Sequence, residues 1–174
     1  PHNDFSCNNG YAKLSYDITS VTSVIATVSY ENTARGVGEF SGEFSHPIYG
    51  DYYRNNDVKN SRSNITLQSS LSESTDLQVT AWHLRQHYDF TNRQLATGTE
   101  ISSDSYLDDG YGGSIKLTWK GQQHTVVIGY DYDSRTLESS TIADNKKGIE
   151  KQATYINDTM SFGRLTITPG LRYD

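Results

Sequence analysis

The chain has 174 residues with a formal net charge of −6, and 34% of its residues are hydrophobic. Its 13 Tyr, 5 Phe and 2 Trp exclude a disordered chain, which is poor in aromatic residues, and the scattered charges without a basic patch exclude nucleic acid as a partner. The single Cys7 excludes an internal disulfide, and no apolar run approaches the ~20 residues of a membrane-spanning helix.

Alternation of apolar and polar residues predicts strands along most of the chain. In residues 11–18, for example, Leu14 and Tyr16 lie on one face, and Ser15 and Asp17 lie on the other. The same period recurs in 24–31, 64–71, 112–120, 125–133 and 164–174.

Residues 76–90 and 151–161 are two further strands with a blurred pattern. In the first, the apolar face changes sides after Ala81, which predicts a β-bulge there. No segment has a helical period. The expected fold is therefore all-β, an antiparallel up-and-down meander of about eight strands, with residues 1–174 as one domain.

The connections between these strands differ in length in a regular way. Short turns are expected at 19–23, 72–76, 121–123 and 162–164, and long polar loops at 32–62, 91–110 and 134–149. Short and long connections alternate, so all short turns fall at one end of the sheet. This sorting is typical of a transmembrane β-barrel, with short periplasmic turns and longer external loops. Strands of about ten residues, tilted by ~45°, would rise roughly 24 Å, which matches the ~25 Å apolar band of such barrels.

The facing of the last strand follows from its alternation. Leu165, Ile167, Leu171 and Tyr173 are expected to face lipid, and Thr166, Thr168, Arg172 and Asp174 to face a wet lumen. Aromatic girdles are expected at the two membrane interfaces, because tryptophan and tyrosine concentrate there. Trp119 and Phe162 lie next to short turns, and four tyrosines lie toward the long loops: Tyr30, Tyr88, Tyr130 and Tyr132.

Two segments resemble strand–turn–strand units of TonB-dependent outer-membrane receptors. "FGRLTITPGLRYD" at 162–174 is similar to the G-L-R-Y-D strand of that family, and Tyr155, Asn157 and Asp158 stand where its preceding strand has Tyr-x-Gln/Asn-Asp/Asn. "YGGSIKLTWKGQQHTVVIGYDYDSR" at 111–135 resembles a second hairpin of the family. Family barrels have about 22 strands around an N-terminal plug. The resemblance therefore implies a portion of the barrel wall, without the plug.

The same resemblance implies a function. The chain would be part of a receptor in the bacterial outer membrane that binds a scarce nutrient of the iron–siderophore, haem or cobalamin class. Import would use energy passed from TonB to the plug. The implied partners are membrane lipid, a nutrient ligand such as a metal chelate, and TonB. No enzyme activity, resident metal or cofactor is implied.

The segment "HPIYGDYYRNN" at 46–56 supplies the first candidate binding residues. It gathers Tyr49, Tyr52, Tyr53 and Arg54 in the longest expected loop. Aromatic residues with arginine are enriched at recognition surfaces, so these side chains are candidates for ligand binding. The alternative is a loop that packs on itself.

His83, Arg85 and His87 are the second candidate group. Their spacing of two places them on one face of a strand. They would form a lumen or rim patch that holds an anionic ligand or a metal chelate. The alternative is ordinary polar lining of a barrel.

Asp104, Asp108 and Asp109 lie in an expected acidic loop. Close carboxylates can bind calcium, but no EF-hand pattern is present, and the alternative is a solvated loop.

Two other functions remain open from the residues alone. A complete eight-stranded outer-membrane barrel could be an adhesin or an enzyme, with His87 near Asp89 or the acids at 104–109 as its only catalytic candidates. A soluble lipocalin-like barrel would bury its apolar face inward and bind a ligand there.

Overall fold

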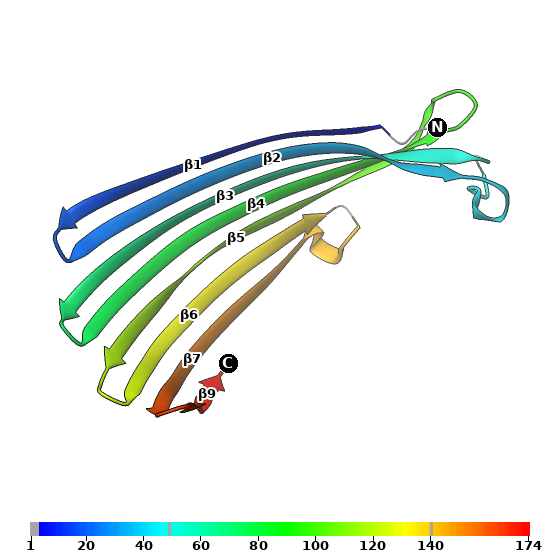
Figure 1. Cartoon of the computed structure of the whole chain (residues 1–174). Coiled ribbons are helices and arrows are strands. Elements are labelled where there is room, and N and C mark those ends of the chain that lie inside the picture. Colours follow the sequence, from blue (N-terminus) through cyan, green and yellow to red (C-terminus); the bar gives the residue numbers. More distant parts are fainter. Residues whose placement is uncertain (1–3, 49, 140) are drawn as a thin grey trace.

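The computed structural model of the protein describes residues 4–48, 50–139 and 141–174. These residues form one curved antiparallel sheet whose strands lie side by side in chain order, with both β8 and β9 paired to β7 (Figure 1). The strands are β1 (Phe5–Thr19), β2 (Thr22–Phe40), β3 (Tyr52–Ser72), β4 (Thr75–Gln94), β5 (Glu100–Lys120), β6 (His124–Ser139), β7 (Lys146–Phe162), β8 (Leu165–Ile167) and β9 (Gly170–Tyr173). Two short 3-10 helices lie in connections, η1 (Gly42–Phe44) and η2 (Ala143–Asn145). Within the described part of the chain, no helix is long and apolar enough to span a bilayer.

The all-β antiparallel meander predicted from the sequence is confirmed, with one difference at its end. The predicted last strand is divided into β8 and β9 at Pro169. The register continues across the break, because Met160 pairs with Ile167 and Asn157 pairs with Gly170. The amide of Asp158 donates to the carbonyl of Pro169 at 3.1 Å, but proline has no N–H to return the bond. The missing donor explains the interruption.

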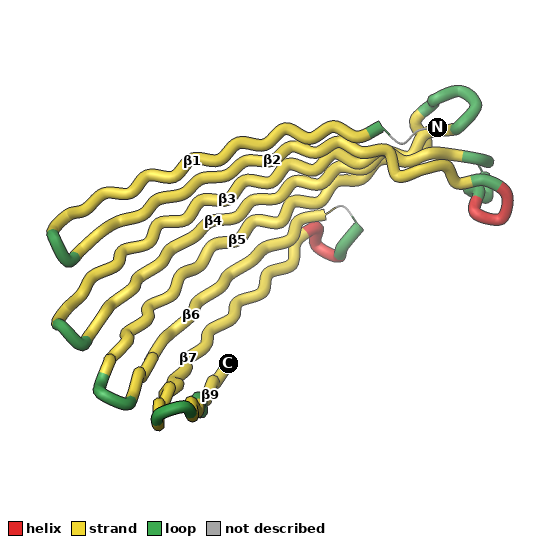
Figure 2. Tube along the Cα trace, viewed as in Figure 1, coloured by secondary structure: helices red, strands yellow, loops and turns green. Residues whose placement is uncertain are grey.

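The sorting of the connections is confirmed as well. The short turns at 20–21, 73–74, 121–123 and 163–164 all lie at one end of the sheet (Figure 2). The connections from β2 to β3, from β4 to β5 and from β6 to β7 lie at the other end of their strands. We call these two ends the short-turn end and the long-loop end.

The predicted length of the strands was wrong. β3 and β5 each have 21 residues, and β4 has 20, about twice the expected ten. At ~3.3 Å per residue such strands are roughly 65–70 Å long. Most of the expected loops at 32–62, 91–110 and 134–149 are therefore strand. Toward the long-loop end, the face that is apolar near the short turns carries polar residues such as Asp57, Lys59 and Asp89, so the apolar alternation that signals a strand is absent there.

The β-bulge expected near Ala81 was also wrong. β4 pairs with β3 and β5 without a register shift from Asp76 to Asn92. Leu77, Val79 and Ala81 therefore share a face with His83 and Arg85, as period-two alternation requires. The rings that suggested a switch, such as Trp82, belong to the opposite face.

The two faces of the sheet differ in polarity and in exposure. The outer face carries the cross-strand series Leu14, Ala26, Ile65, Ala81, and the inner face carries the residues between them. Along β4, His83 and Arg85 are exposed, while Trp82 and Leu84 are half-buried. Side chains crowd on the concave side of a curved sheet, so the inner face is the concave one.

The apolar side chains of the outer face are not buried by any part of the described chain. Ala153, 4% exposed, is the only buried hydrophobic residue among those described, whereas Leu14 is 69% and Leu171 73% exposed. The apolar residues expected to face lipid in the last strand lie on this outer face. Trp119 and Tyr130 are exposed on this face, as expected for residues of the aromatic girdles. Tyr88 was also expected in a girdle but lies on the inner face.

This exposure predicts a dependence on detergent. The purified chain should aggregate in plain buffer, because a large contiguous apolar surface such as this outer face promotes association in water. In detergent micelles or lipid it should give a β-type circular dichroism spectrum. A monodisperse β-protein in plain buffer would contradict the outward orientation of the apolar face.

Candidate functional site

The inner face at the long-loop end carries a group of aromatic rings around one arginine. The group comes from four consecutive strands, which pair Phe40 with Tyr52, Arg54 with Asn92, and Tyr88 with Tyr106. The strands continue past the apolar part of the sheet toward the long-loop end. Their pairing there brings residues that are distant in sequence together on one face. We call this group the aromatic–arginine cluster: Phe40, Tyr52, Arg54, Tyr88, Phe90 and Tyr106.

Arg54 is held between two rings of this cluster. Its guanidinium carbon lies 4.9 Å from the ring centre of Phe90 and 5.8 Å from that of Phe40. Its Nε donates to Oδ1 of Asn92 at 2.8 Å, and Nδ2 of Asn92 donates to Oγ of Ser102 at 2.9 Å. Cation–π contacts and a hydrogen bond thus fix a positive charge among aromatic surfaces.

The rings of the cluster support one another. Phe40 and Tyr52 are stacked, with centres 4.6 Å apart and planes 11° apart. Tyr106 lies 5.9 Å from Phe90 and 6.0 Å from Tyr88. All of these rings are half-buried, so they keep surface for a ligand. The arrangement can bind a large molecule that is both negatively charged and rich in flat apolar surface.

The candidate binding residues that the sequence analysis placed in one loop do not all lie together in the structure. Tyr52 and Arg54 lie together in the cluster, at the start of β3 and not in a loop. Tyr53 points to the outer face between them, paired with Arg93. Tyr49 lies outside the described residues.

Sequence reasoning missed the partners Phe40, Phe90 and Tyr106. One signal was present in the sequence. Tyr88 and Phe90 are spaced by two residues, as Tyr52 and Arg54 are, so each pair lies on one face of its strand. The spacing alone does not show that the two pairs lie near each other. That follows only from the register of β3 with β4, which places Asn56 opposite Phe90.

His83, Arg85 and His87 share one face, as expected, but it is the outer face and not the lumen side. Nε2 of His83 lies 3.1 Å from Oδ1 of Asp109, and Nε2 of His87 lies 3.0 Å from Oδ1 of Asp89. Of the lumen or rim position expected for this group, the lumen alternative was therefore wrong, because it depended on the bulge that the sheet does not contain.

The acidic segment 103–111 is part of β5 and not a loop. Asp108 lies on the inner face opposite Gln86, whereas Asp109 lies on the outer face opposite Arg85. Carboxylates on opposite faces of a strand cannot converge on one calcium ion. Among the described residues, no group of three or more His, Cys, Asp or Glu side chains is placed to hold a metal ion.

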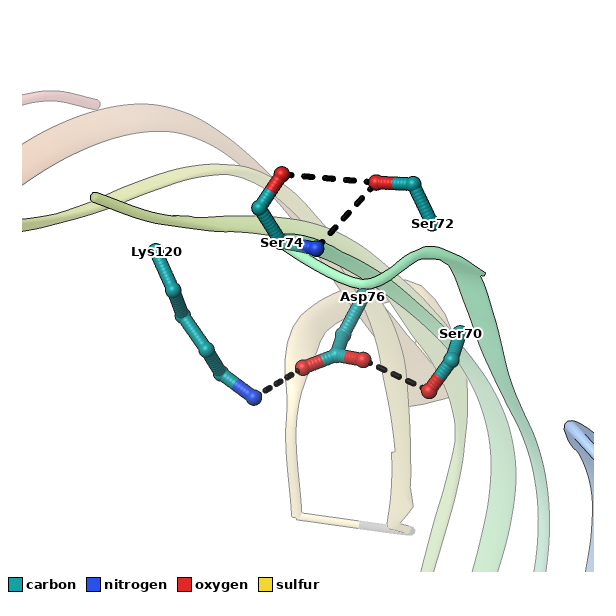
Figure 3. A network of polar contacts seen from close by, with 5 residues as sticks. All are labelled: Ser70, Ser72, Ser74, Asp76 and Lys120. Carbon is teal, nitrogen blue, oxygen red and sulfur yellow. Dashed lines mark hydrogen bonds and ion pairs between the residues drawn. The ribbon is translucent and has the colours of Figure 1, made fainter. Parts of the chain in front are cut away.

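The inner face at the short-turn end carries a small polar network (Figure 3). Nζ of Lys120 lies 2.5 Å from Oδ2 of Asp76, and Oγ of Ser70 donates to Oδ1 of Asp76 at 2.8 Å. In the adjacent turn the amide of Ser74 donates to Oγ of Ser72 at 3.3 Å. The network ties β3, β4 and β5 together where the chain turns. Its exposed groups add little stability.

Aromatic rings cover glycines in the middle of the inner face. Trp82 pairs with Gly112, and Tyr155 pairs with Gly129. Each ring lies across its glycine so closely that a Cβ there would collide with it. On the concave side, each ring therefore occupies the space that a side chain on the neighbouring strand would need.

Comparisons with known proteins bear on the whole sheet. A family model described as "TonB dependent receptor-like, beta-barrel" matches residues 4–174. A solved structure described as "Copper transporter OprC" is similar with a TM-score of 0.78 at 11% sequence identity, and the match covers 97% of this chain. The chain spans 29% of the length of that protein. A search of curated proteins found no match.

Proposed function

Because the chain belongs to the TonB-dependent receptor β-barrel family, whose members lie in the bacterial outer membrane, we propose that it forms wall and binding surface of a nutrient importer. The outer face meets membrane lipid, and the inner face lines the lumen. Import is driven through a plug domain by TonB, as in the family. No enzyme activity is part of this proposal.

The aromatic–arginine cluster is the observation that carries the proposed ligand class. A fixed guanidinium between Phe40 and Phe90 favours a ligand with negative charge and flat rings. Iron–siderophore complexes with aromatic chelating groups and haem, with its carboxylates, have both properties. Cobalamin lacks a net negative charge and fits the cluster less well.

The name of the structural neighbour raises copper as an alternative cargo. Copper binding to protein side chains uses sulfur and imidazole ligands. The cluster offers aromatic carbon, one guanidinium and the amide of Asn92 instead. An organic chelate that carries its own metal ligands therefore suits this surface better than a bare ion.

Calorimetric titration of the chain in detergent micelles tests the proposal. A ferric tris-catecholate complex, haem and cobalamin would be added separately, each against a matched titration into empty micelles. We expect heat of binding from at least one of the two anionic compounds and a much weaker signal from cobalamin. Tightest binding of cobalamin, or binding of none of the three, would contradict the proposed ligand class.

A further inference from the structure

The outer face of strands β1–β4 contains an apolar groove. Its volume is about 610 Å³, within the range of small-molecule sites. Its lining combines small and larger apolar side chains from neighbouring strands. The groove-lining residues of the outer face include Ala12, Leu14, Ala26, Val28, Ile65 and Ala81.

An unpaired arginine lies beyond one end of this groove. Following Ala81 along β4, His83 lines the groove and Arg85 stands about 7 Å further, on the same face. Arg85 is exposed, and no carboxylate of the described residues lies within 4.0 Å of its guanidinium. Its cross-strand partner Asp109 contacts His83 instead.

Arg85 differs in this respect from the other cations described on the outer face. Each of the others has a carboxylate partner: Lys59 with Asp57, His83 with Asp109, His87 with Asp89, Arg93 with Glu100, His124 with Asp158, and Lys146 with Glu138. A cation left without a protein partner at a membrane surface is free to bind lipid phosphate.

The height of Arg85 in the membrane fits that role. The cross-strand series through Arg85 contains Ser61 and Tyr30, and Tyr30 is 48% exposed on the outer face. Tyrosines at such positions mark the interface between hydrocarbon and headgroups. The groove below lies in the hydrocarbon layer, and the long-loop end beyond Arg85 faces the outside.

We propose that the groove and Arg85 together form a binding site for one phosphate-bearing lipid of the outer leaflet. An acyl chain lies against Ala26 and Ala81, and a headgroup phosphate accepts hydrogen bonds from the Arg85 guanidinium. His83, already paired with Asp109, closes the upper end of the groove. The site rests on the family assignment, which places the outer face in lipid, and does not involve the aromatic–arginine cluster.

Lipid binding to the full chain in neutral detergent tests this site. Native mass spectrometry would compare lipid A, which carries phosphates, with its dephosphorylated form. Arg85→Gln should lower the affinity for lipid A about fivefold and leave the dephosphorylated form unchanged. Ala26→Phe, which fills the groove, should weaken both lipids. Lys116→Gln, which removes a cation from the inner face, is the matched control and should change neither.

Three results would overturn the site: equal affinity of the wild type for both lipids, no effect of Arg85→Gln, or displacement of the lipid by inorganic phosphate alone. The last would mean an ion site without an acyl chain. Circular dichroism checks that each variant is folded. Titration with the ferric complex separates this proposal from the transport function, since Arg85→Gln should leave that binding unchanged.

Discussion

Replacing Gly112 by valine is expected to lower the free energy of unfolding of the chain in detergent by roughly 1–3 kcal/mol, the usual cost of overpacking. A Cβ at this position would collide with the carbonyl oxygen of Tyr132 and would lie 2.6 Å from Cζ2 of Trp82. The backbone oxygen cannot rotate away, so β5 and β6 would have to separate locally. The midpoint of urea unfolding, followed by tryptophan fluorescence, measures the effect.

Gly10→Val is the matched control for this experiment. Gly10 is an exposed strand glycine in β1, and nothing lies within 4 Å of the position of a Cβ there. Valine has a higher strand propensity than glycine, so this change should leave the stability equal or slightly higher. Equal losses in both variants would mean that strand glycines matter for a reason other than the contact with Trp82.

Arg54→Ala is expected to have the largest effect on ligand binding. It removes the charge held between Phe40 and Phe90 and leaves Oδ1 of Asn92 without its donor. A hydrogen bond to a charged group contributes about 1.5–3 kcal/mol, so the affinity for the ferric tris-catecholate complex should fall roughly 10- to 100-fold. Calorimetric titration measures it. Unchanged affinity would exclude the cluster as the binding surface.

Tyr52 and Tyr53 offer an internal comparison for the same ligand. They are neighbours in sequence, but Tyr52 stacks on Phe40 on the inner face and Tyr53 lies on the outer face. Tyr52→Ala should weaken binding of the ferric complex, and Tyr53→Ala should not. Equal losses would indicate that the two changes disturb β3 itself.

The sequence predicted the half of the sheet that lies near the short turns. There one face meets an apolar environment, so alternation such as that of Leu14 and Tyr16 is visible in the residues. Toward the long-loop end the outer face is no longer apolar, because residues such as Asp57 and Asp89 occupy it, and segments such as 32–40 have no hydrophobic alternation. The cluster could not be predicted as a site, because Phe40, Arg54 and Phe90 meet only through the register of three strands.

The misplaced bulge has an equally specific cause. Trp82 follows Ala81 directly, and counting its ring as part of the apolar face moves that face to the other side of the strand, which is what predicts the bulge. The structure provides another partner for Trp82, the bare backbone of Gly112. An aromatic residue paired with a strand glycine therefore carries no information about which face meets the membrane.

The length of β4 has a consequence for the rate of uptake. Asn92, at the level of the cluster, lies roughly 36 Å along the strand from Ala81, which is about 25 Å in height at a tilt of ~45°. In the proposed importer, capture at the cluster and passage across the membrane would thus be separated in space, and a ligand would have to leave the cluster before it could cross. Tighter capture lengthens the residence time at Arg54, so beyond an optimum it slows the flux. In the proposed importer, the partial exposure of these rings would set that balance between retention and throughput.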